Sequence, residues 1–211
     1  RRSSDLSEKF LIYSIDSKVK TAKELILKDI KGNKLTLYLF SSENSKGSKS
    51  FYLYSKMMII NETPYNLSYF AVDEKDKKKT PIAGQTPTDP TEKYNKKIML
   101  LDEAKMISIA RKQEKESSDT IVIAGVGNTF ASLVSENEKS MLELGINMSI
   151  SSCDRENYLY TKVITISPRY VVINKTNYLM GIKKDRSSAK PIILEKDVRT
   201  PFYWSEWDKK E

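Results

Sequence analysis

Short segments in which apolar and polar residues alternate recur along nearly the whole chain, and this feature constrains the fold most. A period of two places every second side chain on the same face of an extended strand. Turn-forming stretches separate the segments, such as residues 31–34 (KGNK) and the Ser-rich residues 41–50. Long helical segments, which a doubly wound α/β fold needs between its strands, are absent from the pattern. The sequence therefore predicts an all-β protein made of antiparallel β-sandwich modules in tandem.

These segments give a map of expected strands. They lie at residues 9–15, 22–30, 34–40, 51–60, 67–72, 97–101, 104–111, 120–124, 129–134, 141–151, 159–166, 169–174, 179–183, 191–195 and 201–204. Residues 136–144 carry a weak helical pattern. Residues 73–96 join a run of charges to a stretch with Pro81, Pro87 and Pro90, a composition that predicts a flexible loop.

One motif occurs twice in the same surroundings. Asn61 and Asn174 each follow an apolar run, with Thr two residues later and Tyr four residues later. The two asparagines lie 113 residues apart (174 − 61), a spacing that suits a repeated sandwich module. We therefore predict a first repeat over residues 1–158, including the flexible loop at 73–96, and a second, incomplete repeat over residues 159–211.

The two motifs are also the candidate site. At a strand end, an Asn side chain can accept a hydrogen bond from a backbone N–H and donate two of its own, and a nearby Thr can reinforce the turn. Asn61, Thr63, Asn174 and Thr176 are therefore predicted to fix two turns. A second interpretation stays open beside the first, in which the same amides shape a groove for the backbone of a partner peptide.

The residues that most catalytic chemistries require are missing. The chain has no histidine and a single cysteine, Cys153, which excludes Ser–His pairs, Cys–His pairs and His-ligated metals. Residues 124–129 (AGVGNT) lack the third glycine of a dinucleotide loop and the Lys of a P-loop, so a hairpin turn is expected there. We predict that the protein is not an enzyme and has no catalytic residues, metal or cofactor.

Charge and cysteine content bear on partners and location. A net charge of +8 and a pI of about 9.3 favour contact with anionic surfaces. The basic residues are scattered, however, and no basic motif interleaved with aromatics points to nucleic acid. The lone cysteine and the absence of an apolar signal core predict a reducing, cytoplasmic setting, in which the Asn-x-Ser/Thr sequences are not glycosylated. A basic module that contacts anionic membranes remains an alternative.

Several strings occur in an order that resembles one family. Gly145-Ile146 is followed by residues 161–165 (TKVIT), and Pro168-Arg169-Tyr170 leads into Asn174-Lys175-Thr176. Upstream, residues 51–67 and 106–129 fit the same order, as does PFYW at 201–204. The sequence resembles the adaptor-binding (SHORT-ROOT-binding-like) repeat region of the vacuolar protein sorting-associated protein 13 family of bridge-like lipid transfer proteins. The resemblance covers roughly residues 51–207 and departs from the family pattern at Met57-Met58, Glu62 and Pro64.

The resemblance implies a function for these β-sandwich repeats. Each repeat of the family carries a characteristic Asn, here Asn61 and Asn174, and the region does not itself carry lipid. It is expected to bind short proline-containing (Pro-x-Pro) motifs of organelle adaptor proteins. This binding would place the transporter at the endosome, the vacuole or mitochondrial contact sites, peripheral to the membrane and touching it only indirectly. Two alternatives remain: that these repeats are purely structural scaffold of the same array, or that they are the basic membrane-contacting module.

Overall fold

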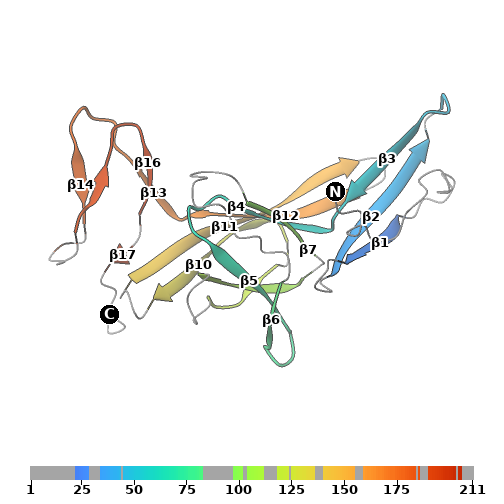
Figure 1. Ribbon diagram of the computed structural model, residues 1–211, viewed down its shortest axis with the longest axis horizontal. Coiled ribbons are helices and arrows are strands. Elements are labelled where there is room, and N and C mark those ends of the chain that lie inside the picture. Colours follow the sequence, from blue (N-terminus) through green and yellow to red (C-terminus); the bar gives the residue numbers. More distant parts are fainter. Residues whose placement is uncertain are drawn as a thin grey trace, which may run out of the picture.

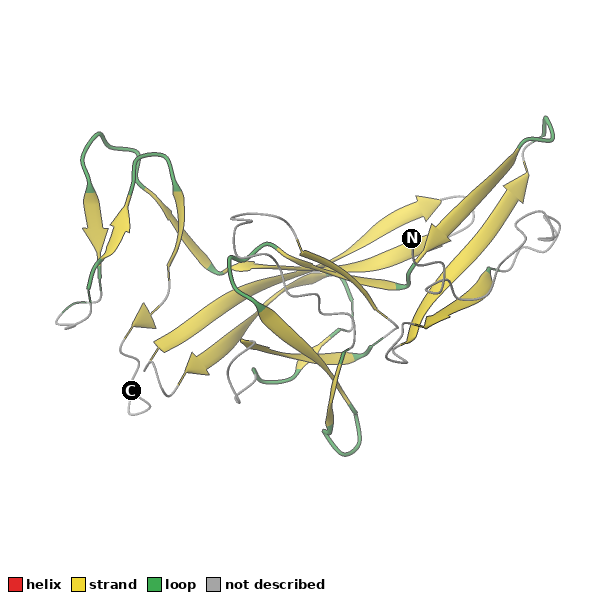
Figure 2. Cartoon of the chain, viewed as in Figure 1, coloured by secondary structure: helices red, strands yellow, loops and turns green. Residues whose placement is uncertain are grey.

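Strands make up the regular secondary structure of the described chain. A computed structural model describes residues 22–28, 34–43, 45–82, 97–101, 104–111, 118–123, 125–135, 140–154, 159–183, 185, 190–202 and 204–205. Within these residues no helix occurs, and nearly all the strand pairs are antiparallel (Figure 2). The predicted all-β fold class is confirmed.

The central part of the molecule is a sandwich of two sheets (Figure 1). The first sheet has the order β10 (Gly127–Ser135), β11 (Ser140–Asp154), β12 (Leu159–Pro168), β4 (Met57–Asn61), β7 (Lys97–Leu101), and β17 (Trp204–Ser205) also pairs with β11. The second sheet has the order β6 (Lys79–Pro81), β5 (Leu67–Val72), β8 (Met106–Arg111), β9 (Ile121–Val122). We call residues 57–168, which span β4 to β12, the central sandwich.

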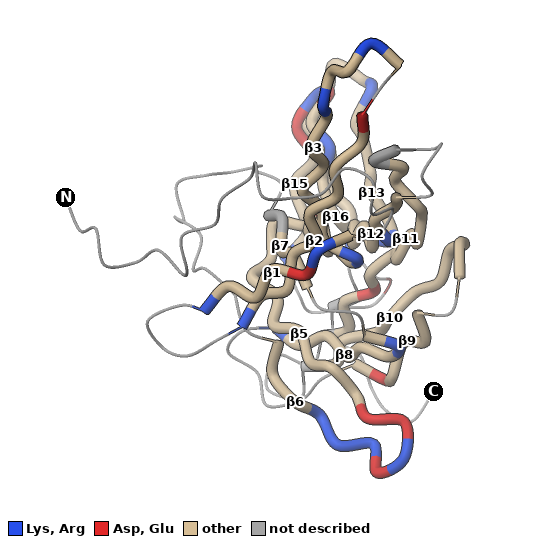
Figure 3. Tube along the Cα trace, turned by 90° about the vertical axis from the view of Figure 1, so that its right-hand side faces the viewer, with Lys and Arg blue, Asp and Glu red and all other residues tan. Residues whose placement is uncertain are grey.

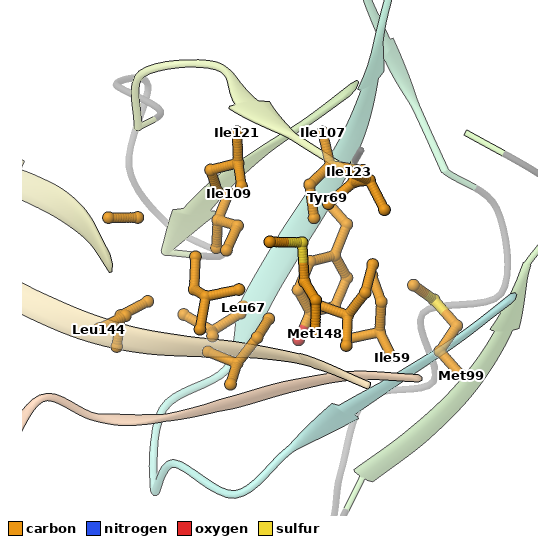
Figure 4. Packing of buried hydrophobic residues seen from close by; sticks show 14 of the residues in the cluster. Ile59, Leu67, Tyr69, Met99, Ile107, Ile109, Ile121, Ile123, Leu144 and Met148 are labelled. Carbon is orange, nitrogen blue, oxygen red and sulfur yellow. The ribbon is translucent and has the colours of Figure 1, made fainter. Parts of the chain in front are cut away.

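Alternating apolar residues from both sheets meet in one core (Figure 4). Among those with no exposed surface are Ile59, Ile107, Ile109, Leu144, Ile164 and Ile166. Tyr69 lies in the same core, and its burial raises the pKa of the phenol well above the usual range. Burial of the period-two apolar positions is thus the main force that holds the two sheets together.

One strand pair in the first sheet is parallel. β12 lies beside β4 with Lys162 opposite Met57 and Ile166 opposite Asn61. The backbone N–H of Glu62 donates to the carbonyl of Ile166 at 2.8 Å. Because parallel neighbours cannot be joined by a tight turn, this pair closes the sandwich across about 100 residues of intervening chain.

Two smaller assemblies lie at opposite ends of the long axis (Figure 1). At one end, the N-terminal sheet is a three-stranded meander of β1 (Lys23–Lys28), β2 (Lys34–Glu43) and β3 (Lys49–Tyr54). At the other end, the C-terminal unit comprises two strand pairs. They are β13 (Tyr170–Ile173) with β16 (Arg199–Phe202), and β14 (Met180–Ile182) with β15 (Ile192–Leu194).

Three predicted features need correction. The strand expected at 51–60 is two strands, because β3 ends at Tyr54 and β4 begins at Met57. Ser55 lies between them, and its hydroxyl is within hydrogen-bond distance of the carbonyls of Met57 (2.7 Å) and Leu101 (3.0 Å). Residues 140–144 of the expected helical turn belong to strand β11. The expected flexible loop at 73–96 contains strand β6, which pairs with β5. In each case tertiary pairing overrides the local pattern.

Other predictions fall partly outside the described residues. The strand expected at 9–15 and residues 83–96 of the loop belong to this group. The division into repeats at residues 1–158 and 159–211 stays a prediction. β12, which that division gives to the second repeat, pairs with β11 on one edge and with β4 on the other.

Candidate functional site

The Asn61 motif forms a closed turn between β4 and β5. The Asn61 side-chain oxygen accepts hydrogen bonds from the backbone N–H of Thr63 (2.9 Å) and from its hydroxyl (2.7 Å). The Asn61 amide donates to the Tyr65 carbonyl at 2.9 Å. The Tyr65 N–H in turn donates to the Thr63 hydroxyl at 3.2 Å. One Asn and one Thr thereby satisfy the polar backbone groups of the turn.

The Asn174 motif repeats this network between β13 and β14. The Asn174 side-chain oxygen accepts from the N–H (2.9 Å) and the hydroxyl (2.7 Å) of Thr176, and its amide donates to the Tyr178 carbonyl at 2.7 Å. The same amide also donates to the Leu194 carbonyl at 3.0 Å, which ties the turn to β15. The equivalence of the two turns follows from the shared pattern Asn-x-Thr-x-Tyr.

Burial decides what these side chains can touch. Asn61 is 2% exposed and Asn174 is 3% exposed, and their amides bond backbone groups of their own turns. Thr63 is buried as well, whereas Thr176 lies on the surface. The four predicted site residues therefore lie in two separate turns of the same build. Contact of these residues with a peptide stays a prediction.

A groove that the sequence did not indicate lies between the edges of the two sheets. β9 and β10 are the end strands of their sheets in the described chain, and they border a hollow of about 350 Å³. Its lining includes Val122 and Phe130, both more than half exposed, with Met148 and Ile121 buried behind them. Apolar side chains exposed beside an open strand edge are typical of a binding surface.

No motif in the sequence marks this groove. Val122 and Phe130 belong to ordinary alternating strands, and β9 and β10 become neighbours only when the sheets stack. The exposure of Val122 and Phe130 could be deduced only from the strand order, because the sequence pattern around an apolar residue is the same on an inner strand and on an edge strand.

Charged residues gather at the β5–β6 turn, where both signs are interleaved (Figure 3). The carboxylate of Asp73 accepts from the backbone N–H groups of Lys75 (2.7 Å) and Asp76 (3.3 Å). These bonds, first that of Lys75, lower the pKa of Asp73 below its ordinary 3.8. Nearby, Glu74 pairs with Lys105 at 3.4 Å. A surface with this mixture of charges favours solvation, and the alternative of a basic membrane-contacting module stays a prediction.

Among the described residues, no cluster of three or more His, Cys, Asp or Glu side chains has the arrangement of a metal site. In the same part of the chain, no helix has the length and apolar character needed to cross a membrane.

Comparison with known sequences places the chain in a family. The sequence model of the adaptor binding domain of vacuolar-sorting associated protein 13 matches residues 2–211. The chain belongs to this family. The match confirms the resemblance and extends it to residues 2–50, which the sequence motifs left uncovered.

A relative of this adaptor binding domain is the intermembrane lipid transfer protein VPS13 of Chaetomium thermophilum. It is 26% identical to the chain over 194 residues, which cover 88% of this chain and 6% of the relative. The chain thus spans a small fraction of the length of the curated relative that it matches.

Proposed function

We propose that this adaptor-binding domain docks short proline-containing motifs of adaptor proteins and so directs a larger lipid transfer protein to membrane contact sites. The observation that carries the proposal is the family match over residues 2–211, whose name specifies adaptor binding. The related protein from Chaetomium thermophilum is an intermembrane lipid transfer protein, and lipid transfer by a longer protein containing this chain is part of the proposal. The domain itself acts as a non-catalytic binding module.

We place the peptide in the groove between β9 and β10. β10 offers nine residues, Gly127–Ser135, that pair on one edge with β11, and its other edge has no strand partner in the described chain. An extended peptide can add to such an edge through main-chain hydrogen bonds while its side chains enter neighbouring pockets. Val122 and Phe130 line the hollow and supply apolar contacts, and the Phe130 ring also carries the Arg169 guanidinium 4.0 Å from its centre.

The chemistry of proline fits an added edge strand. Proline has no N–H, so it occupies positions whose backbone donor would otherwise point away from the sheet. In a Pro-x-Pro sequence the two prolines are two residues apart, so both lie on the same side of an extended strand. The residue between them keeps its N–H for the edge of β10, and the proline rings pack on exposed apolar side chains.

Peptide titration tests this proposal. Labelled peptides with a Pro-x-Pro core are titrated against the chain, beside matched Ala-x-Ala peptides, and fluorescence anisotropy is read. The Pro-x-Pro peptide is expected to bind and the Ala-x-Ala peptide to bind at least ~10-fold more weakly, about 1.4 kcal/mol. Val122→Lys, which places a charge in the groove, should weaken binding by a similar factor.

A matched control uses the same substitution outside the groove. Val126 is more exposed than Val122 and lies outside the lining of the hollow, so Val126→Lys should leave the affinity unchanged. An equal loss of affinity in both variants, or equal affinity for the Pro-x-Pro and Ala-x-Ala peptides, would contradict docking in this groove. No binding of either peptide would contradict the proposed function for these repeats.

A second candidate is a purely structural role in the repeat array. The observation in its favour is the burial of Asn61 and Asn174, whose side chains bond backbone groups within the chain. In that case adaptor peptides bind elsewhere in the longer protein. Val122→Lys in the longer protein would then leave adaptor binding intact, whereas groove docking predicts its loss.

A further inference from the structure

The hydrogen bonds between β11 and β12 show in which direction each backbone group of β11 points. The Arg169 N–H donates to the Glu143 carbonyl at 3.1 Å, and Pro168, which has no N–H, lies opposite Leu144. In an antiparallel pair, the residues that bond the neighbour on one side alternate with those that face the other side. Glu143 therefore bonds toward β12, and Leu144 bonds toward β10.

The register between β11 and β10 carries this alternation to the open edge of the sheet. Leu144 lies opposite Ala131, so Ala131 directs its N–H and C=O groups toward β11, and Thr129, two residues earlier, does the same. Phe130 and Ser132 direct their backbone groups the opposite way. In the described chain that edge of β10 has no strand partner, so these two residues offer their N–H and C=O groups to an added strand.

The same alternation separates the two faces of this edge. The side chain of Ala131 is buried between the two sheets, in the core that also contains Ile121 and Met148. The side chain of Phe130 lies on the outer face and is 54% exposed. Directly opposite residues of an antiparallel pair lie on the same face. A peptide residue opposite Ala131 therefore points into the hollow of about 350 Å³, and a residue opposite Phe130 points outward.

Proline restricts the register of such an added strand. A residue opposite Phe130 needs its own N–H for the edge, whereas a residue opposite Thr129 or Ala131 does not. With the middle residue of Pro-x-Pro opposite Phe130, the prolines lie opposite Thr129 and Ala131, which both line the hollow. A shift by two residues in either direction would place one proline opposite Gly127 or Leu133, which lie outside that lining.

The outer face around Phe130 is apolar and carries no net charge. Gly145, the residue of β11 opposite Phe130, has no side chain, and the Arg169 guanidinium lies 4.0 Å from the centre of the Phe130 ring. Arg169 pairs with Glu143, so the two charges balance. The ring is nevertheless more than half exposed beside the open edge. Such a ring suits a large uncharged side chain of a neighbouring strand.

We propose that Phe130 determines specificity for the residue between the two prolines and selects a large apolar or aromatic side chain there. The inference rests on the proposed function and deepens it, because it assigns the direction, the register and one side-chain preference of the docked peptide. The peptide adds antiparallel to β10, its prolines enter the hollow, and the side chain between them packs on Phe130. A Lys at this position is disfavoured, since it brings a second cation close to Arg169.

Peptides that differ only between the prolines test the selection. In anisotropy titrations, Pro-Leu-Pro should bind at least ~5-fold more tightly than Pro-Ala-Pro, and Pro-Lys-Pro more weakly than Pro-Leu-Pro. Phe130→Ala should reduce the difference between the Leu and Ala peptides to less than about 2-fold, while the preference for Pro-x-Pro over Ala-x-Ala persists. Phe51→Ala is the matched control, because Phe51 is also exposed but lies on β3, and it should preserve both preferences.

Disulfide trapping tests the direction and the register. In a background where Cys153→Ser removes the native thiol, separate variants carry Phe130→Cys, Thr129→Cys or Val134→Cys, and a peptide with Cys between its prolines is added in a thiol–disulfide buffer. Phe130→Cys should give the most product, because hydrogen-bonded antiparallel partners have Cα atoms about 5.5 Å apart, within disulfide reach. Val134→Cys, further along the same edge and face, is the control and should give little.

Three outcomes would overturn the proposal. Trapping mainly by Thr129→Cys would indicate a parallel strand, which reverses the two faces. A Leu-over-Ala preference that is absent, or that persists unchanged in Phe130→Ala, would exclude selection by Phe130, while proline-dependent binding would still support the proposed function. No binding of any Pro-x-Pro peptide would overturn the proposed function and this inference together.

Discussion

At the scale of single residues, the Asn-x-Thr-x-Tyr turns show how one amide can hold a chain reversal together. Asn61 bonds the backbone N–H of Thr63 and the carbonyl of Tyr65 in a site shielded from water. A shorter side chain would leave both backbone groups without these partners. Since a buried polar group that loses its hydrogen bond costs free energy, the turn depends on Asn itself.

We expect Asn61→Ala to lower the free energy of unfolding by about 2–3 kcal/mol, measured by urea denaturation. Asn147→Ala is the control, because Asn147 also begins an Asn-x-Ser sequence but is exposed, and its amide donates to the side-chain oxygen of Asn128 at 2.7 Å. That change should stay within about 0.5 kcal/mol. Equal effects of the two substitutions would refute a special role for the turn.

Asp73 gives a pH-dependent prediction at the same scale. Its pKa in the folded protein lies below 3.8 because the backbone N–H of Lys75, and then that of Asp76, bond the carboxylate. The ionised group therefore stabilises the β5–β6 turn above the unfolded-state pKa, and this contribution is lost as the pH falls through the folded pKa. An NMR titration of the Asp73 carboxyl carbon should have its midpoint below 3.8.

Asp73→Asn supplies the comparison for this titration. Its amide oxygen can still accept the two backbone hydrogen bonds but does not titrate. The amide shift of Lys75, whose N–H bonds the Asp73 carboxylate, should move with acid in the wild type and move much less through the same range in Asp73→Asn. Identical movement in both proteins would mean that another group causes it.

At the scale of elements, Arg169 joins β12 to β13. Its guanidinium pairs with the buried Glu143 and lies 4.0 Å from the centre of the Phe130 ring. At the β3–β4 junction, 113 residues earlier, Lys56 lies 4.7 Å from the centre of the Tyr38 ring. A cation stacked on an aromatic side chain of the meander thus recurs at both junctions.

We expect Arg169→Ala to destabilise this junction by about 1–2 kcal/mol, since it leaves the Glu143 carboxylate without that partner and uncovers Phe130. The estimate is below the usual cost for a fully buried pair because a third of the Arg169 side chain is exposed. Lys175→Ala, which removes an exposed pair with Asp197, should cost less than about 0.5 kcal/mol. Equal costs for the two substitutions would show that the Arg169 pair contributes no more than a surface ion pair.

Asn174→Ala should destabilise only the C-terminal unit, which comprises β13 to β16. Asn174 ties β13, β14 and β15 together through the carbonyls of Tyr178 and Leu194, and the C-terminal unit has few other buried side chains. Local opening should therefore rise there first. Hydrogen exchange should speed up over residues 170–202 while the amides of β5 and β8 keep their wild-type rates. Faster exchange throughout the central sandwich would contradict this local effect.

At the scale of the whole molecule, the complete sandwich does not coincide with the predicted repeats, because β12 lies beyond the predicted boundary at residue 158 and still belongs to the sandwich. The complete sandwich runs from β4 to β12, and its sheets are closed by the parallel β12–β4 pair. The assemblies on either side each resemble one half of it.

Period-two alternation was enough to predict the all-β class and most strand positions, and the repeated motif predicted the two turns. The family was indicated separately, by the resemblance of several strings in their order along the chain. These features depend on neighbours in the sequence, whose side-chain directions and local hydrogen bonds the chain itself determines. The break at Ser55 and strand β6 could not be predicted, because both depend on partners elsewhere in the fold.

Only the tertiary structure decided which strands become edges. It placed β4 parallel to β12, left β9 and β10 at the ends of their sheets beside a groove, and exposed Phe51 and Leu53 while burying their counterparts Ile164 and Ile166. β3 and β12 carry the same alternating pattern, so the pattern cannot distinguish a covered strand from an open one. Long-range pairing makes that distinction, and the candidate binding surface of this protein lies at strands that this pairing leaves at the sheet ends.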